Sequence, residues 1–285
     1  MIRFIVACAG FVAATGFAHA ADSKANLVKR GDYLVNTVLT CGNCHTPKTA
    51  KGADIMAKAF SGGLRFNEPP FDVTAANITP DKETGIGTWS DADIKKLLRT
   101  GIRPNGEPIA AVMPTGFYDI MTERDLNSIV AYLHTLKPIK NKVPDPIYKF
   151  PAPRTEVPGG DKPYTEAMLK DKLKKGFYLV TIAHCLECHT PMGPKGIRLM
   201  KTRLGAGGFP LEGPWGVTVS KNITSSKTKG IGSWTDAEIK RAITHGIDKD
   251  GKHLRPPMGF AYYAKMTPGD LDAIVAFIRT LPPKE

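Results

Sequence analysis

A pentapeptide that occurs twice constrains this chain more than any other feature. It reads Cys-Gly-Asn-Cys-His at residues 41–45 and Cys-Leu-Glu-Cys-His at residues 185–189, and Thr-Pro follows both copies. Two cysteines three positions apart and followed by histidine are typical of covalent haem attachment. Each thiol then bonds to one haem vinyl group, and the histidine ligates the iron. We therefore expect two haem c groups, attached at Cys41, Cys44, Cys185 and Cys188 and ligated by His45 and His189.

Other uses of these cysteines explain less of the pattern. A zinc site needs a second pair of ligands at finger or ribbon spacing, and neither half offers one. A thioredoxin-like site needs a strand before the motif, whereas helical patterns precede both copies. A disulfide within each motif leaves the two histidines unexplained.

Residues 1–20 have the pattern of a secretory signal peptide. Arg3 precedes an apolar run to Phe17, and Ala-His-Ala at residues 18–20 is a typical cleavage site. The run is too short to span a bilayer, and no later stretch is long enough. We expect cleavage near Ala20, a periplasmic location, and no transmembrane segment in the mature chain, so that any membrane association depends on partners.

The chain is basic, with 39 Lys and Arg against 27 Asp and Glu and a formal net charge of +12. The lysines occur in short, scattered groups, so we expect no nucleic-acid site. A scattered positive charge favours electrostatic steering toward an acidic redox partner.

The two halves of the sequence repeat at a nearly constant offset, with a one-residue insertion after the second pentapeptide. Asn-Ile-Thr at 77–79 recurs at 222–224, and Gly-Ile-Gly-Thr-Trp-Ser-Asp at 85–91 recurs as Gly-Ile-Gly-Ser-Trp-Thr-Asp at 230–236. Seven prolines lie from Pro138 to Pro163, a composition typical of a semi-extended linker rather than a packed element. We predict two tandem domains, at residues 22–137 and 164–285, joined by a Pro-rich linker at 138–163.

Three helices are expected in each half, at 26–39, 91–100 and 123–136 and at 166–183, 236–245 and 268–281. Ser90 and Thr235 begin capping-box patterns, Gly101 and Gly246 follow as helix ends, and Thr122 and Thr267 are N-cap candidates. Gly31 and Gly176 fall inside the first helices, where a glycine lets another helix approach closely. No run of alternating residues indicates strands, so the expected fold is all-α.

A low-spin electron-transfer haem needs a second axial ligand, usually Met or His. Met113 lies far downstream of His45, and Met258 lies at the corresponding place after His189; both are in proline-containing loops. Met121 and Met266 also recur, but they precede the N-cap threonines, where an apolar staple residue is expected. The histidines at 134, 184, 245 and 253 lack a counterpart in the other half, and any one could replace a methionine. The preferred iron ligands are therefore His45 with Met113 and His189 with Met258.

Together, the Asn-Ile-Thr string, the Gly-Ile-Gly-x-Trp string and the methionine loop resemble the cytochrome c subunits of periplasmic alcohol and aldehyde dehydrogenases, and related dihaem cytochromes c. The resemblance implies a class I-like cytochrome c fold in each domain and His/Met ligation. It also implies that Trp89 and Trp234 lie near the haem propionates and that Asn77 and Asn222 shape the same loop. Two features depart from the family: its subunits typically have three haem motifs and often a membrane-anchoring tail, and Met258 precedes Gly259 instead of proline.

The resulting hypothesis is an electron carrier, not an enzyme, that receives electrons from a periplasmic dehydrogenase and passes them to a cytochrome or terminal oxidase. The alternative is a dihaem enzyme such as a peroxidase or a thiosulfate dehydrogenase. Such an enzyme needs an open or exchangeable iron site or a ligand other than Met, whereas the sequence offers each haem its own Met.

Overall fold

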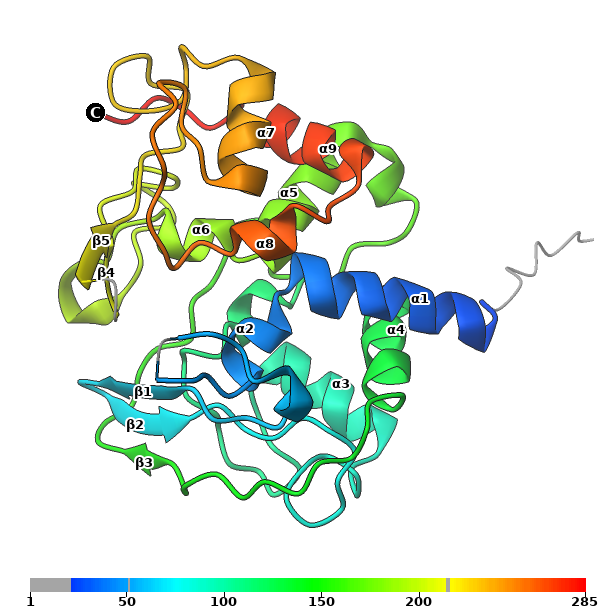
Figure 1. Ribbon diagram of the computed structural model, residues 1–285. Coiled ribbons are helices and arrows are strands. Elements are labelled where there is room, and N and C mark those ends of the chain that lie inside the picture. Colours follow the sequence, from blue (N-terminus) through cyan, green and yellow to red (C-terminus); the bar gives the residue numbers. More distant parts are fainter. Residues whose placement is uncertain (1–21, 51, 214–215) are drawn as a thin grey trace, which may run out of the picture.

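The computed structural model describes residues 22–50, 52–213 and 216–285. The predicted signal peptide, residues 1–20, lies outside the described residues. The described chain is mostly helical with two small sheets, and no helix in it is long and apolar enough to cross a membrane. We call residues 22–137 the first half and residues 164–285 the second half; they occupy the lower and upper parts of Figure 1.

The predicted helices are present in both halves. The first half contains α1 (Lys24–Tyr33), a π-helix (Leu34–Val38), α2 (Cys41–His45), α3 (Asp91–Thr100) and α4 (Glu123–Leu133). The second half contains α5 (Lys172–Ile182), α6 (Cys185–Cys188), α7 (Asp236–His245), α8 (Phe260–Tyr263) and α9 (Pro268–Ile278). Short 3-10 helices occupy Met56–Lys58, Thr115–Phe117, Met168–Lys170 and Pro194–Gly196.

The predicted ends of α3 and α7 are confirmed, whereas the helix predicted at 166–183 begins only at Lys172. Ser90 with Asp93 begins α3, and Thr235 with Glu238 begins α7, each as a complete capping box. Gly101 and Gly246 end these helices with φ of 70° and 64°. This left-handed conformation is readily adopted by glycine, so the local sequence determines both ends of each helix.

The expectation of an all-α fold needs a correction, because the mostly helical chain also contains strands. Strands β1 (Arg65–Glu68), β2 (Phe71–Thr74) and β3 (Ile147–Tyr148) form one antiparallel sheet, and β4 (Pro210–Gly213) pairs with β5 (Gly216–Val219) in another. In register, Arg65 faces Thr74 and Pro210 faces Val219. Such short strands do not show a clear period of two, which explains why the sequence did not reveal them.

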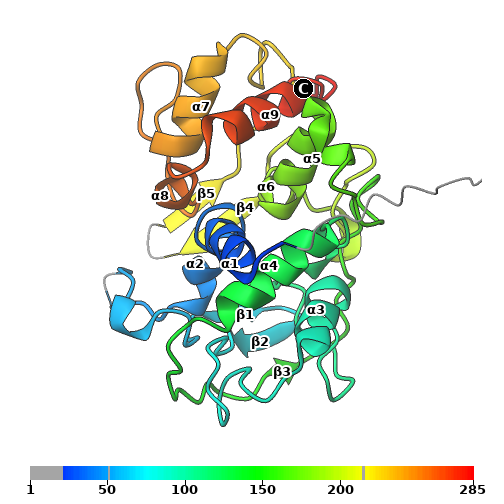
Figure 2. The same cartoon turned by 90° about the vertical axis from the view of Figure 1, so that its right-hand side faces the viewer.

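In each half, the first helix crosses the last at a glycine. A Cβ on Gly31 of α1 would lie 1.9 Å from the carbonyl oxygen of Ser128 on α4. A Cβ on Gly176 of α5 would lie 2.1 Å from the carbonyl oxygen of Ala273 on α9. The predicted close approach is confirmed, and Figure 2 shows α1 lying across α4.

The proline-rich segment at residues 138–163 is more ordered than we expected. It contributes β3 to the first sheet, with Tyr148 opposite Phe71. The guanidinium of Arg154 binds both carboxylate oxygens of Asp119 at 2.7 Å, and Val157 is buried. Backbone pairing and a planar Arg–carboxylate contact hold this segment against the first half. Its sequence has no helical or alternating pattern that would have indicated this order.

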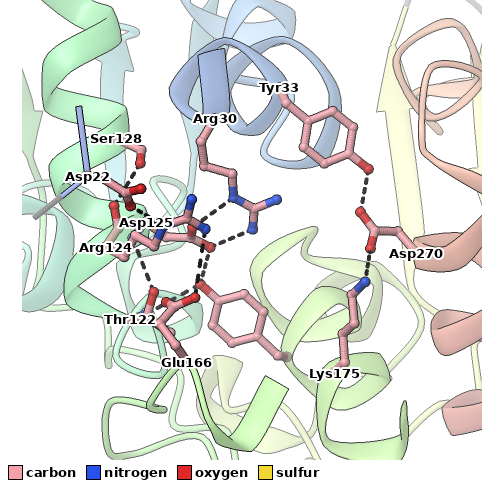
Figure 3. A network of polar contacts seen from close by, with 11 residues as sticks. Asp22, Arg30, Tyr33, Thr122, Arg124, Asp125, Ser128, Glu166, Lys175 and Asp270 are labelled. Atoms are coloured by element: carbon pink, nitrogen blue, oxygen red, sulfur yellow. Dashed lines mark hydrogen bonds and ion pairs between the residues drawn. The ribbon is translucent and has the colours of Figure 1, made fainter. Parts of the chain in front are cut away.

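The two halves meet through reciprocal tyrosine–aspartate hydrogen bonds, which we call the tyrosine exchange (Figure 3). Tyr33 of the first half donates to Asp270 of the second at 2.6 Å, and Tyr178 of the second donates to Asp125 of the first at 2.6 Å. The two tyrosines occupy equivalent positions of the repeat, and so do the two aspartates. Each aspartate also pairs with a cation of its own half: Arg30 contacts Asp125 at 2.8 Å, and Lys175 contacts Asp270 at 2.5 Å.

Candidate haem-binding site

One cavity of about 2620 Å³ receives both pentapeptides. All the residues that the sequence singled out as ligands or haem contacts line it: Cys41, Cys44, His45, Asn77, Trp89, Met113, Cys185, Cys188, His189, Asn222, Trp234 and Met258. The helices α2 and α6, which carry the pentapeptides, lie on facing sides of the boundary between the halves (Figure 1). The fold therefore brings two sites from distant parts of the sequence into one continuous space.

The histidines of the pentapeptides have the same orientation. His45 Nδ1 lies 2.7 Å from the carbonyl oxygen of Ala76, and His189 Nδ1 lies 2.6 Å from that of Lys221. A carbonyl only accepts, so each Nδ1 carries the proton and each Nε2 keeps its lone pair. Burial lowers the pKa of both imidazoles, partly offset by these bonds, which favours the neutral form that ligates a metal.

The asparagine of each Asn-Ile-Thr string fixes the loop that supplies this carbonyl. The Asn77 side-chain oxygen accepts from the backbone N–H and the hydroxyl of Thr79, and its amide donates to the Ile139 carbonyl at 2.7 Å. Asn222 makes the equivalent bonds to Thr224 and to the Lys284 carbonyl. Each asparagine thus ties the loop to the chain that follows the last helix and holds the neighbouring carbonyl toward histidine.

The four cysteines lie in apolar surroundings as free thiols. Burial raises the pKa of Cys41, Cys185 and Cys188 to about 12 and that of Cys44 to about 11. Redox-active and zinc-binding cysteines need a thiolate and a lowered pKa. The raised pKa values therefore do not favour a zinc site, and within the described residues no three His, Cys, Asp or Glu side chains come together as a metal cluster.

The methionines separate into two groups. Met113 and Met258 are partly buried and line the cavity. Met121 and Met266 are buried in the core and do not line it, as expected for staple residues at the start of α4 and α9. Position relative to the cavity therefore distinguishes Met113 and Met258 from the two staple methionines.

Apolar side chains from both halves form the walls of the cavity. Ile78, Ile86 and Leu98 line it in the first half, and Ile223, Ile231 and Ile243 line it in the second. Trp89 and Trp234 are partly buried among them. A large apolar space with a neutral histidine, two thiols and a thioether in each half fits a covalently attached porphyrin.

Several residues around the cavity were not identified from the sequence. Tyr118 lines it, and its hydroxyl lies 2.6 Å from Nε2 of His184, a histidine that the sequence offered as a replacement iron ligand and that is the N-cap residue of α6. Glu187, inside the second pentapeptide, has its pKa raised to about 7 by burial, partly offset by Arg198. A lone tyrosine or glutamate has no spacing pattern, so no signal in the sequence could have identified either one.

The remaining candidate histidines have other partners. His134 Nε2 lies 2.8 Å from Asp91, and His245 Nδ1 lies 2.6 Å from the Thr244 hydroxyl. His253 is exposed and pairs with Ile247 in an isolated bridge. None of these contacts resembles the carbonyl-anchored geometry of His45 and His189.

Comparison with known proteins agrees with this geometry. Residues 173–282 match the family model of cytochrome c. The chain is 28% identical, over 99% of its length, to the cytochrome c subunit of a quinone-dependent alcohol dehydrogenase from Gluconacetobacter polyoxogenes. It is 30% identical over 90% of its length to the fructose dehydrogenase cytochrome subunit of Gluconobacter japonicus, and 29% identical over 85% to a dihaem c-type cytochrome of Cereibacter sphaeroides.

These relatives differ in how much of them the chain covers. It spans 62% of the alcohol dehydrogenase subunit and 53% of the fructose dehydrogenase subunit, but 82% of the dihaem cytochrome.

Proposed function

We propose that this chain, which matches the cytochrome c model over residues 173–282 and resembles the cytochrome c subunits of alcohol, fructose and gluconate dehydrogenases, is a dihaem electron carrier. One haem is attached at Cys41 and Cys44 and the other at Cys185 and Cys188. Bound haem supplies one-electron transfer at iron; the protein binds it, orients its ligands and keeps water from it.

The observation that carries this proposal is the pair of equivalent histidines. Each follows two thiols, donates Nδ1–H to a loop carbonyl and faces the same cavity as one methionine. A hydrogen bond at Nδ1 fixes the tautomer and ring orientation of a ligating histidine and raises its basicity. We infer His45 with Met113 and His189 with Met258 as axial pairs, a set that raises the reduction potential.

The proposal extends to architecture. Residues 22–137 and 164–285 form two class I-like cytochrome c domains joined by residues 138–163. The corresponding helix crossings at Gly31 and Gly176 and the corresponding Asn loops support this division. Asn77 and Asn222 hold the histidine loops, and Trp89 and Trp234 take positions near the haem propionates.

The partners follow from the relatives. Several are named as subunits of dehydrogenases, so we propose a periplasmic dehydrogenase as donor and a cytochrome or terminal oxidase as acceptor. The signal-peptide pattern supports export, with cleavage near Ala20. An iron ligated by its own methionine would lack the open site that a dihaem peroxidase or thiosulfate dehydrogenase needs, which supports the carrier over these enzymes.

Intact mass and the pyridine haemochrome assay test the haem count. The exported chain, made in a host that matures c-type cytochromes, is expected to carry two porphyrins. Cys44→Ala and Cys188→Ala are expected to disturb attachment at one site each and leave the other haem bound. A protein with one haem or none overturns the proposal, and rapid turnover of peroxide or thiosulfate favours the enzyme.

A further inference from the structure

A side-chain hydrogen bond joins the residue before the second pentapeptide to a tyrosine of the first half. The Tyr118 hydroxyl lies 2.6 Å from Nε2 of His184, with the rings tilted at 52° and their centroids 5.4 Å apart. Tyr118 belongs to the first half and is 2% exposed, whereas His184 belongs to the second and is bonded directly to Cys185. Both residues line the shared cavity.

The protonation states make both partners of this bond neutral. Burial lowers the pKa of His184 to about 4, so the imidazole is neutral near pH 7. Burial raises the pKa of Tyr118 well above its ordinary value, and charge on Cys41, Glu187 or Cys44 would raise it further. Tyr118 therefore keeps its proton, and the bond joins a neutral phenol to a neutral imidazole.

Tyr118 also lies on the first haem's side of the boundary. Tyr118 lines the cavity together with Cys41 and Cys44, and its pKa responds to both of them as well as to Glu187 of the second pentapeptide. The pKa of Cys188 in turn responds to Cys44 across the boundary. The phenol ring thus lines the cavity that receives the first attachment site, while its hydroxyl reaches the residue before the second.

The equivalent residues of the repeat, a tyrosine of the second half and the residue before Cys41, do not form the corresponding hydrogen bond. Tyr263 corresponds to Tyr118, and Thr40 occupies the place of His184. Tyr263 donates at 3.0 Å to the carbonyl of Ala183 in its own half. Both tyrosines therefore hold the turn before Cys185, where His184 has a φ of 56°, but only Tyr118 does so from the opposite half.

We propose that Tyr118 and His184 form the bridge through which the two haems of this carrier are coupled. This inference rests on the proposed function. The path runs from the first haem site through the Tyr118 ring, one hydrogen bond and the His184 side chain to Cys185, the attachment point of the second haem. One electron leaves ferrous iron at one site and reduces ferric iron at the other; no bond forms or breaks, and Tyr118 keeps its proton.

The test is the rate of electron transfer between the haems in the full holoprotein, measured after photoreduction of a partly oxidised sample. Tyr118→Phe retains the ring and removes the hydroxyl, and we expect the rate to fall several-fold. Tyr263→Phe removes the corresponding hydroxyl that bonds within its own half, and the rate is expected to stay unchanged. His184→Thr places the residue of the first half at the acceptor position and is expected to act like Tyr118→Phe.

Haem content, Soret circular dichroism and the two midpoint potentials are recorded for each variant. Equal rates in Tyr118→Phe and the parent protein, with both haems bound, overturn the bridge and leave the dihaem carrier intact. Equal slowing in Tyr118→Phe and Tyr263→Phe also overturns it, because the turn alone would then control the rate. Loss of the second haem in both His184→Thr and Tyr118→Phe overturns the bridge as well and assigns the pair to haem attachment.

Discussion

At the scale of single residues, the site depends on a few atoms whose positions are set by the backbone. A loop carbonyl holds each histidine, and an asparagine side chain holds each loop. Removing a buried hydrogen-bond partner is costly because the other partner keeps its desolvation penalty. The two asparagines therefore act on the proposed iron ligands through the backbone of the loops.

Replacing the cavity methionines tests the proposed ligands. We expect Met113→Ala and Met258→Ala each to remove part of the weak thioether-to-iron absorption band of the oxidised protein, because each iron loses its sulfur ligand. The reduction potential of the affected haem is expected to fall. Optical spectroscopy with a redox titration measures both effects.

Met121→Leu and Met266→Leu serve as the matched controls. Both residues are buried away from the cavity, and volume-conserving exchanges in a core cost less than about 1.5 kcal/mol. Their spectra are expected to match the parent protein. A full band in Met113→Ala, or a lost band in Met121→Leu, contradicts the assignment.

The residues of the site differ in how far the sequence could identify them. Cysteines and histidines stand at a fixed spacing, and Met113 and Met258 recur at equivalent positions of the repeat, so pattern alone selected them. Tyr118 and His184 meet only because the two halves pack together. In the repeat, the counterpart of His184 is Thr40. No local rule indicates a contact of that kind.

At the scale of elements, helices were predictable because each carries its own start and stop signals. The first and last residues of α3 and α7 agree with the prediction, because capping boxes begin at Ser90 and Thr235 and glycines follow at 101 and 246. The short strands depend instead on tertiary context: β3 exists because Ile147 and Tyr148 are brought beside Asp72 and Phe71 of β2. Helices α3 and α4 lie between β2 and β3 along the chain, so no local sequence pattern could predict this pairing.

The helix crossings give a prediction at this scale. Gly31→Ala and Gly176→Ala are each expected to lower the free energy of unfolding by about 1–3 kcal/mol, as overpacking does. The new methyl group would meet a backbone oxygen at 1.9 or 2.1 Å, and backbone yields less readily than a flexible side chain. Denaturant unfolding monitored by circular dichroism measures the loss.

Gly269→Ala in α9 is the control for helix propensity. A Cβ there meets nothing within 4 Å, so its stability is expected to stay the same or rise by up to about 1 kcal/mol. If Gly31→Ala were as stable as this control, α1 and α4 would not pack as closely as described.

At the scale of the whole molecule, the tyrosine exchange couples the two halves. Asp125 is 1% exposed as a side chain and is bound by both Arg30 and Tyr178, one from each half. A hydrogen bond to a charged group contributes about 1.5–3 kcal/mol. The contact therefore links the stability of one half to the folding of the other.

Removing the two hydroxyls tests this coupling. Tyr178→Phe is expected to lower the unfolding free energy by about 1.5–3 kcal/mol, and Tyr33→Phe, half-buried, by less. The double variant is expected to separate one thermal transition into two, which calorimetry resolves. Tyr132→Phe, whose hydroxyl bonds Asn36 within the first half, is expected to leave a single transition; a single transition in the double variant too would show that the halves are coupled elsewhere.

The reciprocity of the tyrosine exchange has a consequence for ancestry. Each half presents one phenol donor and one carboxylate acceptor, so its contact face is complementary to a copy of itself, as in an isologous dimer. If both halves descend from one domain, a precursor bearing that face would already pair with a copy of itself. Joining two copies in one chain would then allow a difference between them that identical chains cannot have, such as His184 in the place of Thr40.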